Sequence, residues 1–230
     1  MEYSVQLKGF IKSVGADLVG FTDVESLQGI YTEPKNLLDS FTHVISAGVE
    51  VPKSVFDTIH DKPTPIYNVV YQTINRILDE IGYKTSRHLQ NKGYSGLPIP
   101  ASQIVDREKW YGAISHKAVA RMAGLGWQGK NLLLITPKFG SRIRLVTILT
   151  NAPLKIDLPM KNRCGACTKC KDACPVGAIK GVVTEDRYKN RNEALHFDKC
   201  VSKLTVEFAE LPNIDSPICG ICIKACPYSK

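Results

Sequence analysis

The sequence predicts an α+β protein of two domains, and three observations support this. Between Tyr67 and Gly93 apolar residues recur at three- and four-residue steps, the pattern of a long amphipathic helix. The runs 131–136 and 142–150 are rich in β-forming residues and predict strands. Beyond residue 157 these patterns stop, and Pro, Lys and Cys dominate. For a chain of 230 residues we therefore expect an α/β domain at 1–157 and a cysteine-rich domain at 158–230.

Shorter patterns fill the rest of the first domain. We expect helices at 4–14, 36–40 and 116–123, strands at 16–21 and 43–51, a loop at 52–65 and an extended segment at 96–101. Gly82 is expected to interrupt the long helix, because glycine is a poor helix former. The runs 131–136 and 142–150 are separated by a short turn, so we expect them to form a hairpin or a nearby antiparallel pair.

The cysteines of the second domain follow a distinctive spacing. One run reads Cys164-Gly-Ala-Cys167-Thr-Lys-Cys170-Lys-Asp-Ala-Cys174-Pro175, and a partial copy reads Cys219-Gly-Ile-Cys222-Ile-Lys-Ala-Cys226-Pro227, with Cys200 upstream of it. Three cysteines at three-residue steps followed by Cys-Pro is the run that binds iron–sulfur clusters in bacterial ferredoxins. The chain has 8 cysteines, which are enough for two [4Fe-4S] clusters with none left over.

The same spacing predicts how the cysteines divide between the clusters. In two-cluster ferredoxins the cysteine before proline binds the other cluster. We therefore expect one cluster on Cys164, Cys167, Cys170 and Cys226, and the second on Cys200, Cys219, Cys222 and Cys174. Zinc and disulfides are the alternatives. Zinc favours two Cys-x-x-Cys pairs with a long spacer. Disulfides need an oxidising compartment, and the sequence does not support one, because no apolar signal segment follows Met1.

Charge and hydropathy narrow the class of protein. The formal net charge is +8, and two oxidised clusters with their thiolates would lower it to about +4. Basic residues gather around the cysteines, either as a surface that compensates cluster charge or as a landing site for an acidic electron donor or a polyanionic substrate. No apolar run approaches the ~20 residues that span a bilayer. We expect a soluble, cytoplasmic protein that moves electrons and does not bind membranes.

A second motif, Ala123-Gly-Leu-Gly-Trp-Gln-Gly-Lys-Asn131, precedes the strand runs. Gly124, Gly126 and Gly129 would let the backbone approach a ligand closely. Trp127 offers a flat apolar face with one hydrogen-bond donor, and Lys130 and Asn131 add a charge and an amide. The alternative is a tight helix-to-strand turn with Trp127 in the core.

The stretch from His116 to Ile135, the run that ends Leu-Thr-Asn-Ala-Pro-Leu154 and the two cysteine runs occur in one order and spacing. In this combination the chain closely resembles the epoxyqueuosine reductase family and the related reductive dehalogenases, strongly over about residues 90–230. The resemblance implies a nitroreductase-like, cobalamin-binding α/β domain followed by a bacterial two-[4Fe-4S] ferredoxin-like domain. It also implies that both clusters pass electrons to a corrinoid, which then reduces a C–O or C–X bond, and it makes the glycine-rich motif the candidate corrinoid contact.

The chain departs from the family in two respects. The resemblance implies an acidic proton donor roughly a dozen residues before the glycine-rich motif, but counting back thirteen positions from Ala123 gives Trp110. Asp106 and Glu108 are close but out of register, so we take Tyr111 and His116 as candidate general acids; the alternative for His116 is a structural residue at a helix start. The chain also ends at Lys230, without the helical-repeat domain of the members that act on tRNA, so we do not expect tRNA as a partner.

Two other functions stay open. The chain could be an electron-transfer protein that serves a separate partner such as a corrinoid protein, or a reductase that binds FMN, since related folds hold that flavin. In each case we expect a low-potential electron donor, ferredoxin or flavodoxin, and a small-molecule substrate or a corrinoid as the acceptor.

Overall fold

A computed structural model describes residues 2–230 and divides the chain into two compact units. Unit 1 comprises residues 1–49, 74–126 and 144–160, and unit 2 comprises residues 50–73, 127–143 and 161–230. Both units are thus built from segments that are distant in the sequence. The division predicted at residue 157 stays a prediction, but the cysteine-rich segment shares its unit with two earlier segments.

Unit 1 is built on a four-stranded sheet with the order β1-β2-β6-β3. The strands are β1 (Leu18–Asp23), β2 (His43–Glu50), β3 (Gly96–Ile99) and β6 (Ile143–Thr150). Strand β1 pairs antiparallel with β2, and β3 pairs antiparallel with β6. The inner strands are almost wholly buried, which explains why their sequences are continuous apolar runs.

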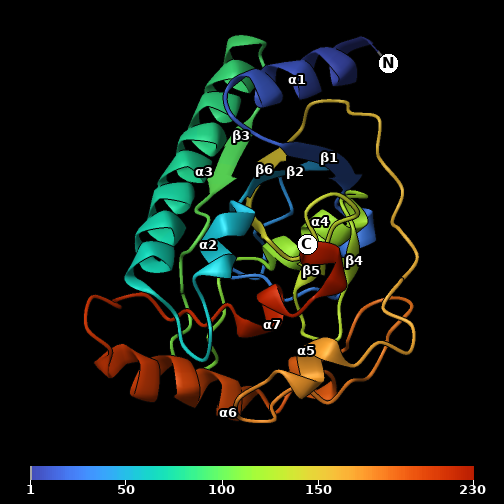
Figure 1. Ribbon diagram of the computed structural model, residues 1–230. Coiled ribbons are helices and arrows are strands. Elements are labelled where there is room, and N and C mark those ends of the chain that lie inside the picture. The colour runs from blue at the N-terminus through green and yellow to red at the C-terminus, as the bar shows by residue number, and fades with distance from the viewer. Residues whose placement is uncertain (1) are drawn as a thin grey trace. The chain divides into compact units, whose positions relative to one another are not determined.

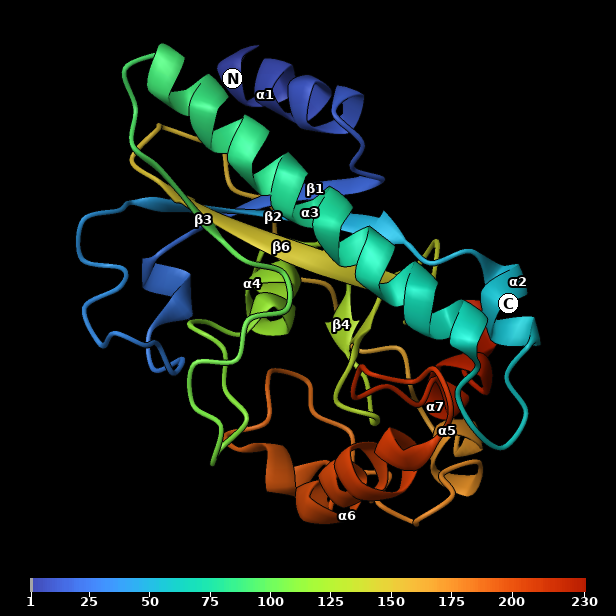
Figure 2. The same cartoon turned by 90° about the vertical axis from the view of Figure 1, so that its left-hand side faces the viewer.

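Helices cover both faces of this sheet (Figures 1 and 2). Helix α1 (Glu2–Ser13) and the long α3 (Pro65–Asn91) lie on one face, and α4 (His116–Met122) lies on the other. Leu78 and Ile81 of α3 are fully buried. The helix predicted at 67–93 is therefore confirmed, but it does not break at Gly82. A Cβ there would be 3.3 Å from Pro98 and Val146, so this glycine serves close packing.

Two other predictions for the short elements are wrong. Residues 36–40 form successive turns with bonds such as Leu37 N to Pro34 O, and these turns do not add up to a helix. Residues 52–65 are not all loop, because α2 (Lys53–Asp57) begins directly after Pro52 and buries Val55 and Phe56. Proline fits the start of a helix, since the first turn has no intrahelical use for its missing N–H.

The predicted hairpin of 131–136 with 142–150 is also wrong. Strand β5 (Leu134–Ile135) pairs antiparallel with β4 (Trp127–Gln128), whereas β6 pairs with β3. The connecting turn closes on itself through two backbone bonds between Thr136 and Gly140. These local bonds end β5 after two residues, so it cannot extend into a hairpin with β6.

Unit 2 has short helices and much irregular chain. Its cysteine-rich segment contains the helices α5 (Lys169–Asp172), η2 (Arg191–Glu193), α6 (Phe197–Ser202), η3 (Lys203–Glu207, a π-helix), η4 (Phe208–Glu210), α7 (Ile221–Lys224) and η5 (Pro227–Ser229). Side-chain bonds tie the cysteine-rich segment to the earlier ones: Asn68 Nδ2 and Gln72 Nε2 donate to Asp215 Oδ1 at 2.6 and 2.5 Å. Arg142 donates to the Ser229 carbonyl at 2.8 Å. Among the described residues, no helix is both long and apolar enough to cross a membrane.

Candidate iron-sulfur centre

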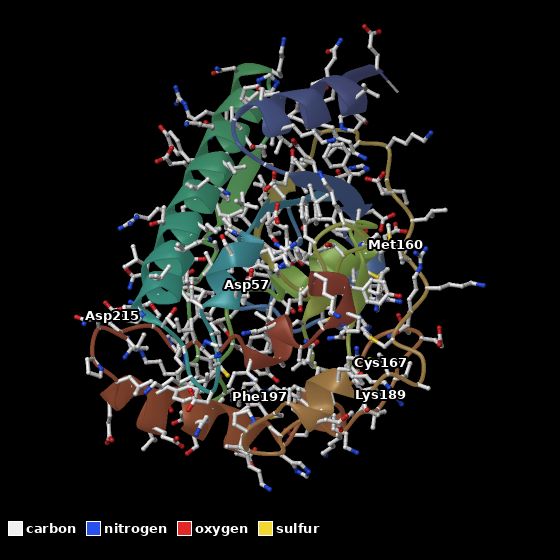
Figure 3. The ribbon with its side chains drawn as sticks, in the orientation of Figure 1. Asp57, Met160, Cys167, Lys189, Phe197 and Asp215 are labelled. Carbon is white, nitrogen blue, oxygen red and sulfur yellow. The ribbon has the colours of Figure 1, made fainter. Side chains whose placement is uncertain are left out.

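Four cysteines gather on one side of unit 2, and we call them the cluster I site: Cys164, Cys167, Cys170 and Cys226. Burial raises the pKa of Cys170 to about 11, and the nearby charges of the other three raise it further. Cys164 and Cys167 come from the loop that leads into α5, where Figure 3 labels Cys167, and Cys170 lies within α5. The fourth directly precedes Pro227 and is buried. The structure thus brings together the four cysteines that the spacing assigns to one cluster.

The remaining cysteines form a second group, the cluster II site: Cys174, Cys200, Cys219 and Cys222. Burial raises the pKa of Cys219 to about 11, and the charges of Cys200 and Cys174 add to this. Burial also raises the pKa of Cys222 well above its ordinary value, and all three of its companions contribute. Cys170 contributes as well, so the two sites are neighbours.

The chemistry of these thiols fits iron–sulfur clusters better than a single ion. A tetrahedral zinc site would bring its sulfurs to about 2.3 Å from one atom. Within residues 2–230, no three His, Cys, Asp or Glu side chains converge closely enough to hold one metal ion. Half-buried thiols with raised pKa values would stay protonated at neutral pH, whereas a coordinating metal deprotonates them. Two groups of four more widely spaced thiols suit a larger body such as a cubane.

The glycine-rich motif divides between the two units. Trp127 belongs to unit 2, where it packs with Ile135 and with Cys226 and Cys164 of the cluster I site. Its side chain is 1% exposed, the Tyr228 ring meets it edge-on at 4.9 Å, and the Arg163 guanidinium lies 5.7 Å over its ring. Its indole N–H is buried without a hydrogen-bond partner. The described contacts of the ring are therefore with the protein itself, and a contact of Trp127 with a corrinoid stays a prediction.

Lys130 and Asn131 are also buried in unit 2. Lys130 Nζ donates to the carbonyl of Cys167 at 2.8 Å. Asn131 Oδ1 accepts from Leu133 N at 3.2 Å, but its Nδ2 is buried without a partner. Asn131 is followed by Leu132, which packs in the apolar cluster that Cys170, Cys174 and Cys222 border. Of the motif, Trp127 and Lys130 thus contact residues of the cluster I site directly.

The glycines make room for the protein's own atoms. A Cβ on Gly124 would lie 2.7 Å from the Leu158 carbonyl oxygen in unit 1. A Cβ on Gly129 would lie 2.7 Å from Asn131 Oδ1 and from Ile135. Gly126 is buried. At Gly124 and Gly129 the close approach is therefore internal, and contact of the three glycines with a corrinoid stays a prediction.

His116 begins α4 in unit 1, and both of its ring nitrogens have partners. Nδ1 lies 2.7 Å from Thr147 Oγ1, and Nε2 lies 3.0 Å from the carbonyl of Pro100, which can only accept. The proton is therefore on Nε2. Burial lowers the pKa of His116 to about 4, so the ring is neutral at pH 7. This geometry favours the structural alternative, and the role of His116 as a general acid stays a prediction.

Tyr111 lies opposite Asp106 in a small two-residue ladder. Each backbone N–H donates to the other's carbonyl at 3.1 Å, and the Tyr111 ring stacks on Tyr31 at 4.6 Å. Residues 107–110 form the tip of this hairpin, where Trp110 has a positive φ of 55°. The ladder places Asp106 directly next to Tyr111, so four residues loop out between them.

The count along the sequence put Asp106 out of register, whereas the ladder places it directly opposite Tyr111. The signal that could have found it is the turn-forming stretch Asp-Arg-Glu-Lys between two extended segments. Hydrogen bonds from the backbone N–H of Lys109 lower the pKa of the Asp106 carboxyl. In the described arrangement this side chain is therefore ionised at neutral pH.

Known proteins match both the cysteine-rich segment and the chain as a whole. Residues 163–229 match the family of 4Fe-4S double cluster binding domains. An epoxyqueuosine reductase of Bacillus subtilis is 36% identical over 98% of this chain and 63% of its own length. The chain resembles epoxyqueuosine reductases. It spans between about a third and two thirds of these relatives, since the match to the Bacillus anthracis reductase covers 30% of that protein.

Solved structures share the fold. An epoxyqueuosine reductase bound to an epoxyqueuosine-modified tRNA stem loop has a TM-score of 0.64, 24% identity, and covers 99% of this chain and 65% of its own. The Bacillus subtilis reductase, described with an aspartate catalytic loop swung out of its active site, has the same score and identity over 100% of this chain and 66% of its own. A reductive dehalogenase described with B12-dependent dehalogenation has a TM-score of 0.73, 20% identity, and covers 96% of this chain and 31% of its own.

Proposed function

We propose that the chain is an iron–sulfur oxidoreductase of the epoxyqueuosine reductase type, which passes electrons through two [4Fe-4S] clusters to a corrinoid. The observation that carries the proposal is the crossing of the two cysteine sets: Cys174 joins the later run and Cys226 joins the earlier one. This is the arrangement of two-cluster ferredoxins, whose clusters lie close enough to exchange electrons. Unit 2 therefore serves as a short electron relay.

The acceptor that we propose is cobalamin, which when reduced supplies a strong nucleophile and reductant. The likeness of the fold to a dehalogenase described as B12-dependent supports it. The nitroreductase-like and cobalamin-binding description of residues 1–157 belongs to this proposal. The chain's own part is to bind the cofactor, exclude water and deliver a proton to the leaving group.

We propose Asp106 as that proton donor, in preference to Tyr111 and His116. The hairpin sets its carboxyl beside Tyr111, and Tyr31 and Glu33 complete a polar group there, with Tyr31 Oη donating to Glu33 Oε2 at 3.1 Å. The Bacillus subtilis relative carries a mobile catalytic loop with an aspartate, and Asp106 sits on a comparable loop. The carboxyl can take up a proton once it leaves the Lys109 N–H, because that bond is what lowers its pKa.

The proposed reaction is reductive cleavage of a C–O or C–X bond. The first substrate to test is epoxyqueuosine in a tRNA stem loop, although the sequence alone did not lead us to expect tRNA as a partner. A relative of this fold binds such a stem loop. A free low-potential ferredoxin or flavodoxin would supply the electrons, since the cluster thiolates set a potential that can fall well below that of ordinary donors.

The test is anaerobic reconstitution followed by titration with cobalamin and, separately, with FMN, with the visible spectrum as the readout. We expect about eight iron atoms per chain and a spectral change with cobalamin alone. Binding of FMN alone would replace this proposal with a flavin reductase, and binding of neither would leave an electron carrier. With the loaded protein and the stem loop, Asp106→Asn should abolish turnover, whereas Tyr111→Phe and His116→Gln should retain it.

A further inference from the structure

We propose that the chain makes cluster I easier to reduce than cluster II, by means of one unpaired buried cation and one unpartnered indole N–H. This inference rests on the proposed function, because it requires both clusters to be present. It concerns three residues of unit 2 that no cysteine pattern identifies: Trp127 and Lys130 at the cluster I site, and Lys203 at the cluster II site.

Lys130 is the first of the two features. Lys130 is only 5% exposed. Its Nζ donates a hydrogen bond to the carbonyl of Cys167, a cluster I ligand. Within the described residues, no carboxylate lies within ion-pair distance of it. A positive charge in a poorly solvated site acts strongly on its neighbours, because little water screens it. Lys130 therefore favours the reduced form of cluster I, which carries one more negative charge.

Trp127 is the second feature of the cluster I site. Its indole is buried against Cys164 and Cys226, and its N–H has no acceptor among the described residues. A buried donor without a partner costs roughly 1–3 kcal/mol, so a native protein normally supplies one. A cluster on Cys164 and Cys226 would bring sulfur atoms next to this ring. Hydrogen bonds to cluster sulfurs are among the features that set the potential, and they favour the reduced state.

The cluster II site has a lysine of its own, but its charge is neutralised. The Lys203 ammonium lowers the pKa of Cys219, so it lies near this ligand. It also forms an ion pair with Glu207 within the π-helix Lys203–Glu207 and lies 4.8 Å over the Phe208 ring. The carboxylate offsets the cation, so its effect on cluster II is smaller than that of Lys130 on cluster I.

Backbone donors do not reverse this difference. Cys174 Sγ in the cluster II site accepts from Ala178 N at 3.3 Å. At Cys226 in the cluster I site, burial raises the pKa, whereas the backbone N–H groups of Tyr228 and Ser229 and the Ser229 side chain lower it. At Cys219 in the cluster II site, burial also raises the pKa and the backbone N–H of Ile221 lowers it, so both sites have such donors. The exposed basic residue Arg163 adds little, since water screens it. The two lysines and the indole therefore decide which cluster holds the electron.

The experiment is an EPR-monitored redox titration of the reconstituted full chain. Cys164→Ser and Cys200→Ser assign the signals, because each alters one cluster. In the wild type we expect the first electron on cluster I. Lys130→Met should shift the reduction equilibrium of cluster I at least about tenfold toward the oxidised form, which is ~59 mV for one electron. Trp127→Phe should shift it in the same direction by a smaller factor, and neither should move cluster II.

Two control variants separate charge from structural damage. Lys130→Arg keeps the cation and should keep the potential of cluster I, even if stability falls. Glu207→Gln leaves Lys203 unpaired and should make cluster II easier to reduce. The inference is overturned if Lys130→Met and Trp127→Phe leave cluster I unchanged, if they move cluster II instead, or if the first electron enters cluster II. Iron well below eight atoms per chain overturns the proposed function, and this inference with it.

Discussion

The two units of the molecule are stabilised in different ways. Unit 1 has a four-stranded sheet whose inner residues, such as Ile45 and Ile148, are fully buried under helices. Residues 161–230 of unit 2 have helical segments of three to six residues, of which only α6, η3 and η4 join into a longer run, from residue 197 to residue 210. Isolated helices of that length are unstable, because nucleation costs more than a few bonds return. The comparison teaches that an apolar core suffices for one unit, whereas the other depends on what its cysteines bind.

The apolar clusters of unit 2 support this view. One consists of Leu132, Ile179, Tyr188, Ala194 and Leu195, and Cys170, Cys174 and Cys222 lie at its edge. Burial raises the pKa of Tyr188 to about 12, and the charges of Cys164 and Cys170 add to this. The residues that would form the core thus border the cluster sites directly. Binding of metal and folding are coupled in such domains.

Removal of the clusters is the change with the largest expected effect. Chelation of iron should expose the backbone amides of residues 161–230 to rapid hydrogen exchange, because their short helices lose their support. The amides of β2 and β6 should stay protected. Hydrogen-exchange mass spectrometry measures both in one sample. Persistent protection of 161–230 in the iron-free chain would show that unit 2 folds without clusters.

Replacement of single ligands sharpens the comparison within unit 2. Cys226→Ser should alter the same EPR signal as Cys164→Ser, because both thiols belong to the cluster I site. Cys174→Ser should alter the other signal, as Cys219→Ser does. Iron content should fall by about half in each variant that loses its cluster. If Cys226→Ser instead matched Cys219→Ser, the assignment by crossing would be wrong.

Gly20→Ala tests how far unit 1 depends on packing alone. A Cβ at this position in β1 would lie 2.0 Å from the Ala123 carbonyl oxygen, which belongs to the backbone and cannot yield easily. We expect a loss of roughly 3 kcal/mol or more in the free energy of unfolding. Urea unfolding followed by circular dichroism measures this loss.

Gly9→Ala is the matched control for that substitution. Gly9 is exposed in the middle of α1, and a Cβ there would meet nothing within 4 Å. Alanine should stabilise the helix by about 0.5–1 kcal/mol. If Gly20→Ala were as harmless as Gly9→Ala, the close approach of β1 to residue 123 would not matter for stability.

The stability of unit 1 should also depend on His116. Its pKa is lowered to about 4, so the unfolded chain takes up a proton at a higher pH than the folded chain does. The contribution is fully present above about pH 6.5 and is lost as the pH falls toward 4. Its size is at most about 3 kcal/mol, and less because the ring is only half-buried.

Substitution of His116 isolates this effect. His116→Gln cannot take up a proton in this range, so the difference between variant and wild type should shrink from pH 7 to pH 4.5. Urea unfolding at the two pH values measures it, and comparison at each pH cancels titration elsewhere in the chain. A difference that stays constant would show that His116 is as easily protonated in the folded as in the unfolded chain.

The sequence predicted best what is local. The long helix follows from its own periodicity, which depends on nearby residues. The grouping of the cysteines is not local, and it was predicted only because the spacing matches the known crossing of two-cluster ferredoxins. The pairing of β5 with β4 and of β6 with β3 was missed, since partners are chosen across the chain. The pairing of Asp106 with Tyr111 was not predicted, because a count along the sequence ignores a hairpin tip that loops out. Burial of Trp127 was one of two alternatives, but its packing against Cys226 was not predicted, because nothing near residue 127 indicates what covers it.

The exchange of Cys174 and Cys226 between the two runs has a consequence for how the protein matures. Neither cubane can be completed by one half of the cysteine-rich segment, so the first to be inserted must already bring Cys226 to the earlier run or Cys174 to the later one. That insertion fixes the path of the whole cysteine-rich segment, so the cysteines of the second site are already in place. In the wild-type chain the second cluster should therefore follow the first readily, and molecules with one cluster should be rare.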